Sequence, residues 1–245
     1  GKERAWQMYP IRSIHDAGRV EGLTLMPEMS HQHAPSTARL HELMATQLGR
    51  PVRISIEARR PNSPEANGSA TDDEAEFLVG LIDWCRYVVR TPILEVETRQ
   101  ASGGDGGDRP GTVVTLKFGA PRSQTTGPVV ELNLLEPAAG EAASAAGDEN
   151  PAPPIPRYRL ECERGTAEID SLVGIRWRAE GDPVDESLTS DRSDVEVLID
   201  HFCRRALGGL IPVPDIADIC RGLAVVGAVR QSLAAGKAVK VNGQV

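Results

Sequence analysis

The chain has 245 residues, a formal net charge of −8 and a sequence pI near 5.2. This acidic balance argues against nucleic acid as the main partner, since phosphate binding needs clustered Lys and Arg. No apolar run reaches the roughly 18 to 20 residues that a membrane span needs, and the N-terminus lacks the apolar segment of a secretory signal, so we expect a cytoplasmic protein without a membrane partner.

The first predicted elements are a strand, a helix and a second strand. Residues 22–27 (GLTLMP) form a short apolar run that predicts a buried strand. Apolar residues then repeat at helical spacing from Pro35 until Gly49, which predicts a helix. In residues 51–59 apolar and polar side chains alternate, which predicts a half-buried strand with Val52, Ile54 and Ile56 on one face.

A loop and a second helix come next. The composition of residues 60–73 is that of a loop, and residues 74–90 carry one apolar stripe typical of an amphipathic helix. The acidic residues Asp72, Asp73 and Glu74 suit the positive end of this helix. Alternating patterns then predict six strands, at 93–100, 111–120, 128–136, 157–163, 166–170 and 174–180. Residues 137–154 are rich in Ala, Gly, Pro and acidic residues, which indicates a flexible insertion.

Two helices, at 193–207 and 215–235, and a short strand at 238–241 complete the pattern, with Gly236 ending the second helix. Short connections between successive strands favour antiparallel pairing. The sequence therefore predicts an α+β fold: a large, mostly antiparallel open sheet with helices packed on one face. The other face is left for a second subunit, another domain or solvent.

The four cysteines, at positions 85, 162, 203 and 220, have no C-x-x-C spacing, so the sequence does not support a zinc knuckle or a redox centre. Each lies in an apolar-periodic segment, which predicts buried free thiols.

Three phrases, in this order, resemble the C-terminal domain of the Gfo/Idh/MocA oxidoreductase family. They are GLTLMPEMSHQHAPSTARLHELMATQLGRPVRISIEARRP from residue 22, EFLVGLIDWCRYVVRTPILEVETR from residue 76, and LIDHFCRRALGGLIPVPDIADICRGLAVVGAVRQSLAAGKAVKV from residue 198. The resemblance implies that residues 1–30 are a remnant of an N-terminal dinucleotide-binding (Rossmann) domain and its crossover. Residues 31–245 would then be the C-terminal substrate-binding and oligomerisation domain.

The resemblance also implies a cofactor, a substrate class and an assembly. The intact protein would use NAD or NADP on a sugar- or polyol-like substrate, and would form a homo-oligomer through the open face of the sheet. No cofactor is expected in this chain alone, because no G-x-G-x-x-G opens a helix after a strand. The glycine cluster at 103–108 lies between two predicted strands and indicates a hairpin loop.

The chain departs from the family at its catalytic residues. The Glu-Lys-Pro motif that supplies the family's lysine is absent. When the family's D-x-G-x-H-x-x-D pattern is aligned on Asp83, Glu76 stands at the first Asp and Gly80 stands at the His. Glycine cannot move a proton, so the usual general base is missing. An oxidoreductase with another base and a non-catalytic assembly module of the same fold both remain open.

The predicted substrate-cleft residues are Glu28, His31, His33, Glu76, Gly80 and Asp83. Those at 28, 31 and 33 follow the first predicted strand, where the family's cleft lies, and could contact substrate or replace the base. The alternative for these three is a solvated turn between domains.

The histidines do not predict a metal site. His31 and His33 together with His41 could ligate a metal, but His41 lies within a helix and need not converge with them, so no metal is expected. His201 is interpreted as structural.

Overall fold

The computed structural model describes residues 13, 16–18, 21–61, 70–101, 110–120, 126–136, 155–189, 192–211 and 213–241. The predicted insertion at 137–154 and the glycine cluster at 103–108 lie outside these residues, as do residues 1–12 of the predicted remnant and 62–69 of the predicted loop. In the described ranges, no helix is both long and apolar enough to cross a membrane.

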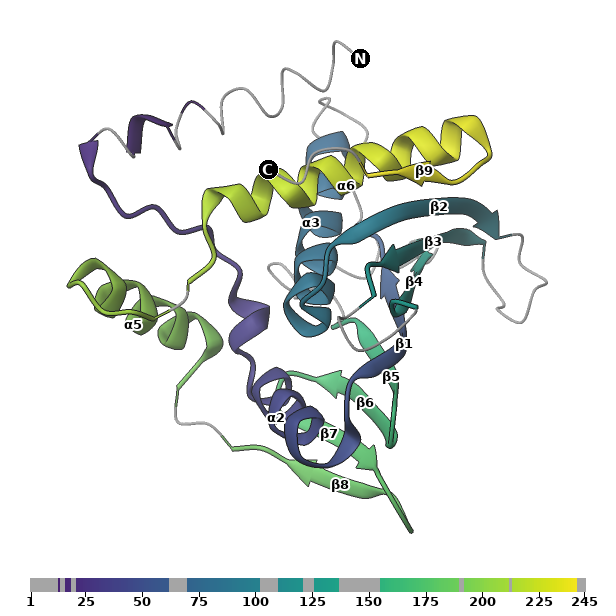
Figure 1. The fold of residues 1–245 in the computed structure, drawn as a ribbon, viewed down its shortest axis with the longest axis horizontal. Helices are drawn as coiled ribbons and strands as arrows, with labels where there is room; N and C mark the ends of the chain where they lie inside the picture. The colour runs from purple at the N-terminus through teal and green to yellow at the C-terminus, as the bar shows by residue number, and fades with distance from the viewer. Residues whose placement is uncertain are drawn as a thin grey trace, which may run out of the picture.

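One open sheet of nine strands organises the structure (Figure 1). Its strands lie in the order β8-β7-β6-β5-β1-β4-β3-β2-β9. All neighbours are antiparallel except β1 and β4, which are parallel. The strands are β1 (Pro51–Arg59), β2 (Ile93–Ala101), β3 (Gly111–Phe118), β4 (Val129–Leu135), β5 (Arg157–Cys162), β6 (Gly165–Ser171), β7 (Gly174–Arg178), β8 (Val184–Ser187) and β9 (Val239–Lys240). The predicted α+β fold with a mostly antiparallel open sheet is confirmed.

Helices α2 (Pro35–Leu43), α3 (Ala70–Val89) and α6 (Ile216–Ala235) lie over one face of this sheet. Helix α5 (Asp194–Ala206) packs chiefly on a 3-10 turn, η1 (Ser30–His33), and a π-helical turn, η2 (Met44–Leu48), follows α2. α6 packs against α3 and β2, whereas α2 packs against β6 and β7. Gly236 ends α6 in the left-handed conformation, at φ 61°, as the sequence predicts.

The two faces of the sheet differ in polarity because side chains alternate along each strand. On β1, Ile54 and Ile56 are buried beneath the helices and pair in register with Val130 and Leu132 of β4. The intervening β1 positions, 53, 55 and 57, carry Arg, Ser and Glu. Ion pairs such as Lys117–Glu95 and Arg159–Glu168 bridge neighbouring strands on this second face. A partner docking on it would therefore meet a polar, charged surface.

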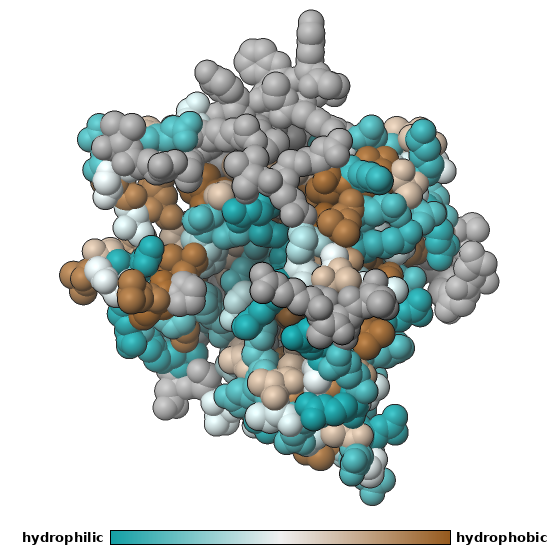
Figure 2. Space-filling model, viewed as in Figure 1, coloured by the Kyte–Doolittle hydropathy of each residue, from teal (hydrophilic) through white to brown (hydrophobic). Residues whose placement is uncertain are grey.

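Helix α5 stands out because little of it is buried. Leu198 alone among its thirteen residues is buried, while Val195 and Ile199 are exposed. Just beyond its end, Leu207 and Leu210 are 89% and 94% exposed. We call these four exposed residues the α5 patch; Figure 2 shows apolar side chains gathered over this helix, at the left of the molecule.

Three sequence predictions were wrong. Residues 22–27 are not a strand, because a strand needs a hydrogen-bonded neighbour and the described sheet offers this segment none. Val52 does not share the buried face of Ile54 and is 53% exposed, since the register shifts between Pro51 and Arg53. Cys203 is exposed on α5, although an apolar-periodic segment carries it.

The other cysteines agree better with the prediction of buried free thiols, whereas one helix boundary and one strand differ from the sequence prediction. All four thiols are free; Cys85 is buried, and Cys162 and Cys220 are partly buried. Helix α3 begins at Ala70, four residues before its predicted start. The edge strand β8 was not predicted, because its sequence, VDES, has too few apolar residues to show an alternating pattern.

Candidate functional site

A cleft of about 330 Å³ lies where α3 meets η1, α5 and the start of α6. Polar side chains from each of these elements line it, and Ile211, Val213 and Pro214 add an apolar rim. The polar residues are Gln32, His33, Asp83, Arg86, Tyr87, His201 and Asp218.

Asp83 is the most deeply buried charged group of the cleft. It occupies the middle of α3, where the apolar stripe buries the helix against the sheet. Gln32 of η1 donates its side-chain amide to one carboxylate oxygen, and Arg86 lies 3.5 Å from the other. Burial raises the pKa of Asp83, although the hydrogen bond from Gln32 and the charge of Arg86 act in the opposite direction.

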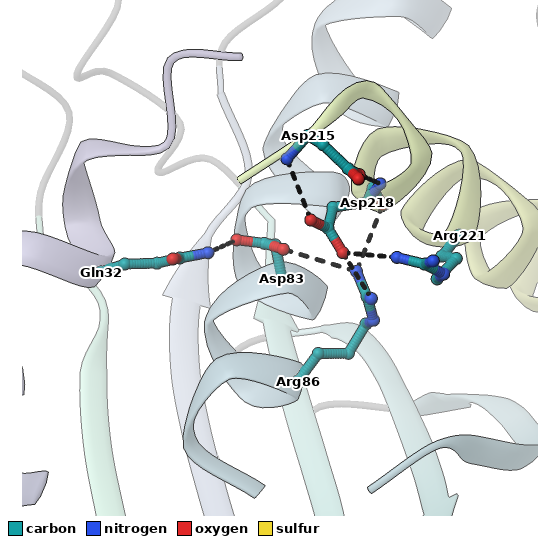
Figure 3. A network of polar contacts seen from close by, with 6 residues as sticks. All are labelled: Gln32, Asp83, Arg86, Asp215, Asp218 and Arg221. Atoms are coloured by element: carbon teal, nitrogen blue, oxygen red, sulfur yellow. Dashed lines mark hydrogen bonds and ion pairs between the residues drawn. The ribbon is translucent and has the colours of Figure 1, made fainter. Parts of the chain in front are cut away.

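Arg86 connects α3 to the first turn of α6 (Figure 3). Its Nη2 donates to Oδ1 of Asp218 over 2.9 Å, and its Nη1 donates to the Asp218 carbonyl over 3.2 Å. Arg221 adds a further hydrogen bond, with 2.8 Å between its Nη1 and the same carboxylate oxygen. The network therefore carries two carboxylates and two guanidinium groups.

The start of α6 holds Asp218 in place through a capping box. Asp215 accepts a hydrogen bond from the backbone N–H of Asp218, and the Asp218 carboxylate accepts one from the backbone N–H of Asp215. Burial alone would raise the pKa of Asp218, but the Asp215 N–H and the neighbouring Arg86 more than offset it, so the pKa is lowered. Asp218 is therefore ionised at neutral pH.

Two hydrogen bonds fix η1 against α3. The indole Nε1 of Trp84 donates to Oγ1 of Thr37 over 3.1 Å. That hydroxyl in turn donates to the backbone carbonyl of His31, also over 3.1 Å. Both Trp84 and Thr37 are buried, so this chain of contacts positions Gln32 and His33 from within the core.

His33 and His201 meet edge to face in the cleft wall, with ring centroids 4.9 Å apart and an interplanar angle of 85°. His33 Nε2 and His201 Nδ1 are buried and have no hydrogen-bond partner within the described residues. Burial lowers the pKa of His33, His201 lowers it further, and Asp194 partly opposes both effects. His33 is therefore neutral at neutral pH.

Of the six predicted cleft residues, His33 and Asp83 line this cleft. Glu28, His31 and Glu76 are exposed and are not among its lining residues. Gly80 is partly buried on α3, and a Cβ added there would meet no atom within 4 Å. A side chain would therefore fit at position 80, so the glycine is not imposed by close packing.

Several lining residues could not be found by sequence reasoning. No motif or spacing in the sequence marks Gln32, Tyr87 or His201 as part of a binding site. Arg86 and Asp218 show one only in retrospect: Arg86 is three residues beyond Asp83 on the same helix, and Asp218 is three residues after a helix N-cap.

The three histidines considered for a metal have different surroundings. His33 packs on His201, His41 packs on Tyr87, and His31 is exposed. Burial, together with the charge of Arg90, lowers the pKa of His41 to about 4. In the part of the chain that the structure describes, no group of three or more His, Cys, Asp or Glu side chains could hold a metal ion.

The lining suits a small, neutral, hydroxyl-rich molecule. An amide, two imidazoles and a phenol can donate or accept hydrogen bonds, a guanidinium donates them, and the two carboxylates accept them. A few convergent polar groups beside an apolar rim are typical of small-molecule sites.

Comparison with known proteins finds similarity only in structure. No protein-family model and no curated protein matches the chain. An aldose-aldose oxidoreductase from Caulobacter crescentus, solved with glycerol, is 16% identical with a TM-score of 0.67, over 94% of this chain and 68% of its own. A levoglucosan dehydrogenase, solved with NADH and levoglucosan, is 15% identical with a TM-score of 0.68, over 95% of this chain and 70% of its own.

A UDP-N-acetylglucosamine 3-dehydrogenase from Acidithiobacillus ferrooxidans gives a similar result. It is 15% identical with a TM-score of 0.65, over 92% of this chain and 66% of its own. The chain thus spans about two thirds of the length of each of these proteins. It has the α+β open-sheet fold that these three oxidoreductases contain, which is the fold implied by its resemblance to Gfo/Idh/MocA C-terminal domains.

Proposed function

We propose that this chain is the substrate-binding and oligomerisation part of a Gfo/Idh/MocA-type, NAD(P)-dependent oxidoreductase that acts on a sugar- or polyol-like compound. The observation that carries the proposal is the fold shared over more than nine tenths of the chain with three oxidoreductases whose named substrates or ligands are sugars or glycerol. The hydroxyl-matching side chains of the cleft support the same substrate class.

The proposal divides the chain at its N-terminal side. Residues 1–30 would belong to the crossover from a nucleotide-binding domain, and residues 31–245 would form the substrate-binding domain. NAD or NADP would then be held by a domain outside this chain. The α5 patch supports this arrangement, since exposed apolar side chains gathered in one region can mark a surface that another domain or subunit covers.

The chemistry would need a proton acceptor other than position 80. When a carbinol carbon passes hydride to a nicotinamide, its hydroxyl proton must go to a basic group. Asp83 is already engaged by Gln32 and Arg86. An imidazole, of His33 or His201, is the remaining candidate among the described residues of the cleft, and His33 is in the required neutral state at neutral pH.

Binding measurements on the chain itself test the substrate class. Saturation-transfer NMR with levoglucosan, glycerol and a panel of free pyranoses should show saturable binding of at least one of them. Asp83→Asn should weaken that binding at least about tenfold, because it removes the charge that orients Gln32 and Arg86. Arg176→Gln, on the exposed face of β7, is the matched control and should leave binding unchanged.

Two outcomes contradict the proposal. If the folded chain binds none of these compounds, the substrate class is wrong. If NADH fluorescence shows tight, saturable binding of NADH to this chain, the assignment of the cofactor to another domain is wrong.

The alternative is a non-catalytic assembly module of the same fold. Gly80 at the family's His position favours it. Sedimentation velocity separates the two: a stable oligomer that binds no sugar favours the module, whereas sugar binding favours the enzyme.

A further inference from the structure

We propose that α5 is a hinged wall of the cleft, held closed by the contact between His33 and His201 and released when these two imidazoles take up protons. The slight attachment of α5, the glycines beyond its C-terminal end and the chemistry of the two rings support this hinge, whichever compound the cleft binds.

The attachment of α5 is slight and local. The helix packs chiefly on η1, the turn that carries His33, and Leu198 is its single buried residue. His201 is the residue through which α5 lines the cleft, and it does so beside His33. Displacing α5 would therefore open one side of the cleft at a small cost in buried apolar surface.

A pair of glycines follows the helix. Gly208 adopts φ 93°, a left-handed conformation that other residues rarely reach. Next to it, a Cβ on Gly209 would lie 2.7 Å from the Arg204 carbonyl. These positions can take up a change in backbone direction at the C-terminal end of α5, which suits a hinge.

The two rings supply the sensitivity to acid. Each has a buried nitrogen without a hydrogen-bond partner in the described chain, and a protonated imidazole carries N–H donors on both nitrogens. Protonating either ring therefore leaves a buried, unsatisfied donor, and protonating both places two positive charges in contact. Each effect disfavours the closed position of α5.

Charged and titratable groups face the cleft from each of the helices that border it. On α5, Asp194 favours protonation of His33, but burial and His201 outweigh it, so the net pKa is lowered. From α3, Asp83 and Arg86 face the cleft together with Tyr87, whose pKa is raised by burial. From α6, Asp218 is paired with Arg86 and Arg221.

The sign of the effect follows from linkage. The closed form binds fewer protons than the open form, because burial and His201 lower the pKa of His33 below its ordinary value of 6.5 in the closed form, and displacing α5 would relieve both effects. Above pH 6.5 the balance is independent of pH. Below it, each proton taken up favours the open form by up to about tenfold per pH unit.

Hydrogen exchange followed by mass spectrometry tests the proposal on the full chain. Protection factors of the α5 amides, corrected for intrinsic exchange, should fall several-fold, and by up to about tenfold, between about pH 7.5 and about pH 5.5. The amides of α6 should keep their protection, and they report that the domain stays folded. His33→Gln should remove most of the dependence on pH, and His201→Gln should weaken it, because burial of His33 remains. His31→Gln changes an exposed histidine of the same turn and should retain it.

Equal protection of α5 at both pH values in the wild-type chain would overturn the inference. A dependence on pH that persists in both His201→Gln and His33→Gln would overturn it as well. If His33→Gln loosens α5 at both pH values while α6 stays protected, His201→Gln decides whether protonation is the trigger.

Discussion

Replacing Arg86 with Met should expose how the cleft network is held together. Methionine keeps the length and the apolar stem of the arginine but removes its charge and donors. Asp218 keeps Arg221 and the Asp215 N–H as partners, and its side chain is 25% exposed, so it loses little. The main cost falls on Asp83, whose side chain is only 6% exposed and which keeps Gln32 alone.

The size of the stability loss follows from the burial of Asp83. Removing one partner of a buried ion pair costs about 3–5 kcal/mol, and the lower end applies here because Gln32 still donates to Asp83. A loss of about 3 kcal/mol in the free energy of unfolding corresponds to a fall in Tm of about 6–12 °C for a chain of this size. Urea unfolding followed by circular dichroism measures the first quantity, and calorimetry measures the second.

The way in which the stability loss of Arg86→Met changes with pH identifies Asp83 as its cause. The pKa of Asp83 is already raised in the folded protein, and losing Arg86 raises it further. A carboxyl group with a raised pKa stabilises the fold at low pH and loses that contribution as the pH rises through its folded value. The deficit of Arg86→Met should therefore be larger at about pH 8 than at about pH 5.

Two variants complete the Arg86 experiment. Adding Asp83→Asn should recover part of the loss at high pH, since it removes the unpaired charge. Arg176→Met, which breaks an ion pair on the exposed side of β7, is the control and should not change the unfolding midpoint measurably. A deficit that is the same at both pH values would refute the assignment of the cost to Asp83.

Three further predictions concern α5, α6 and the thiols. Gly236→Ala should lower stability by about 1–2 kcal/mol in urea, because the left-handed backbone strains alanine while no neighbour crowds it; an unchanged midpoint contradicts this. Ser193→Ala removes the capping box of α5 and should cost about 1 kcal/mol, seen as faster exchange of the first α5 amides but not those of α6. Cys203 should react with a thiol reagent in the native state whereas Cys85 should not, because Cys85 is buried and its pKa is raised; equal labelling rates would disprove this.

The sequence predicted the fold well where periodic patterns are long. Eight of the nine strands and the helices at α2, α3, α5 and α6 appear close to their expected positions, because alternation and helical stripes record which face is buried. The alternating pattern gave wrong predictions where pairing with a neighbouring strand, and not the local composition, decides the structure. The apolar run at 22–27 has no neighbouring strand, and a register shift turned Val52 away from the core.

The cleft was only partly predictable for a related reason. Asp83 and His33 were singled out from the order of motifs, and both line it. Arg86 and Asp218 join them through hydrogen bonds across 132 residues of sequence, and His201 meets His33 from another helix. Such contacts depend on how α3, α5 and α6 pack, which local sequence does not record.

The two edges of the sheet bear on whether copies of the chain can add to one another strand by strand. An open sheet ends in unpaired N–H and C=O groups that can recruit a strand from another molecule. Here the edges are the four-residue β8 and the two-residue β9, and β8 carries Asp185 and Glu186. Short and charged edges give an incoming strand little to bind, which limits runaway strand addition.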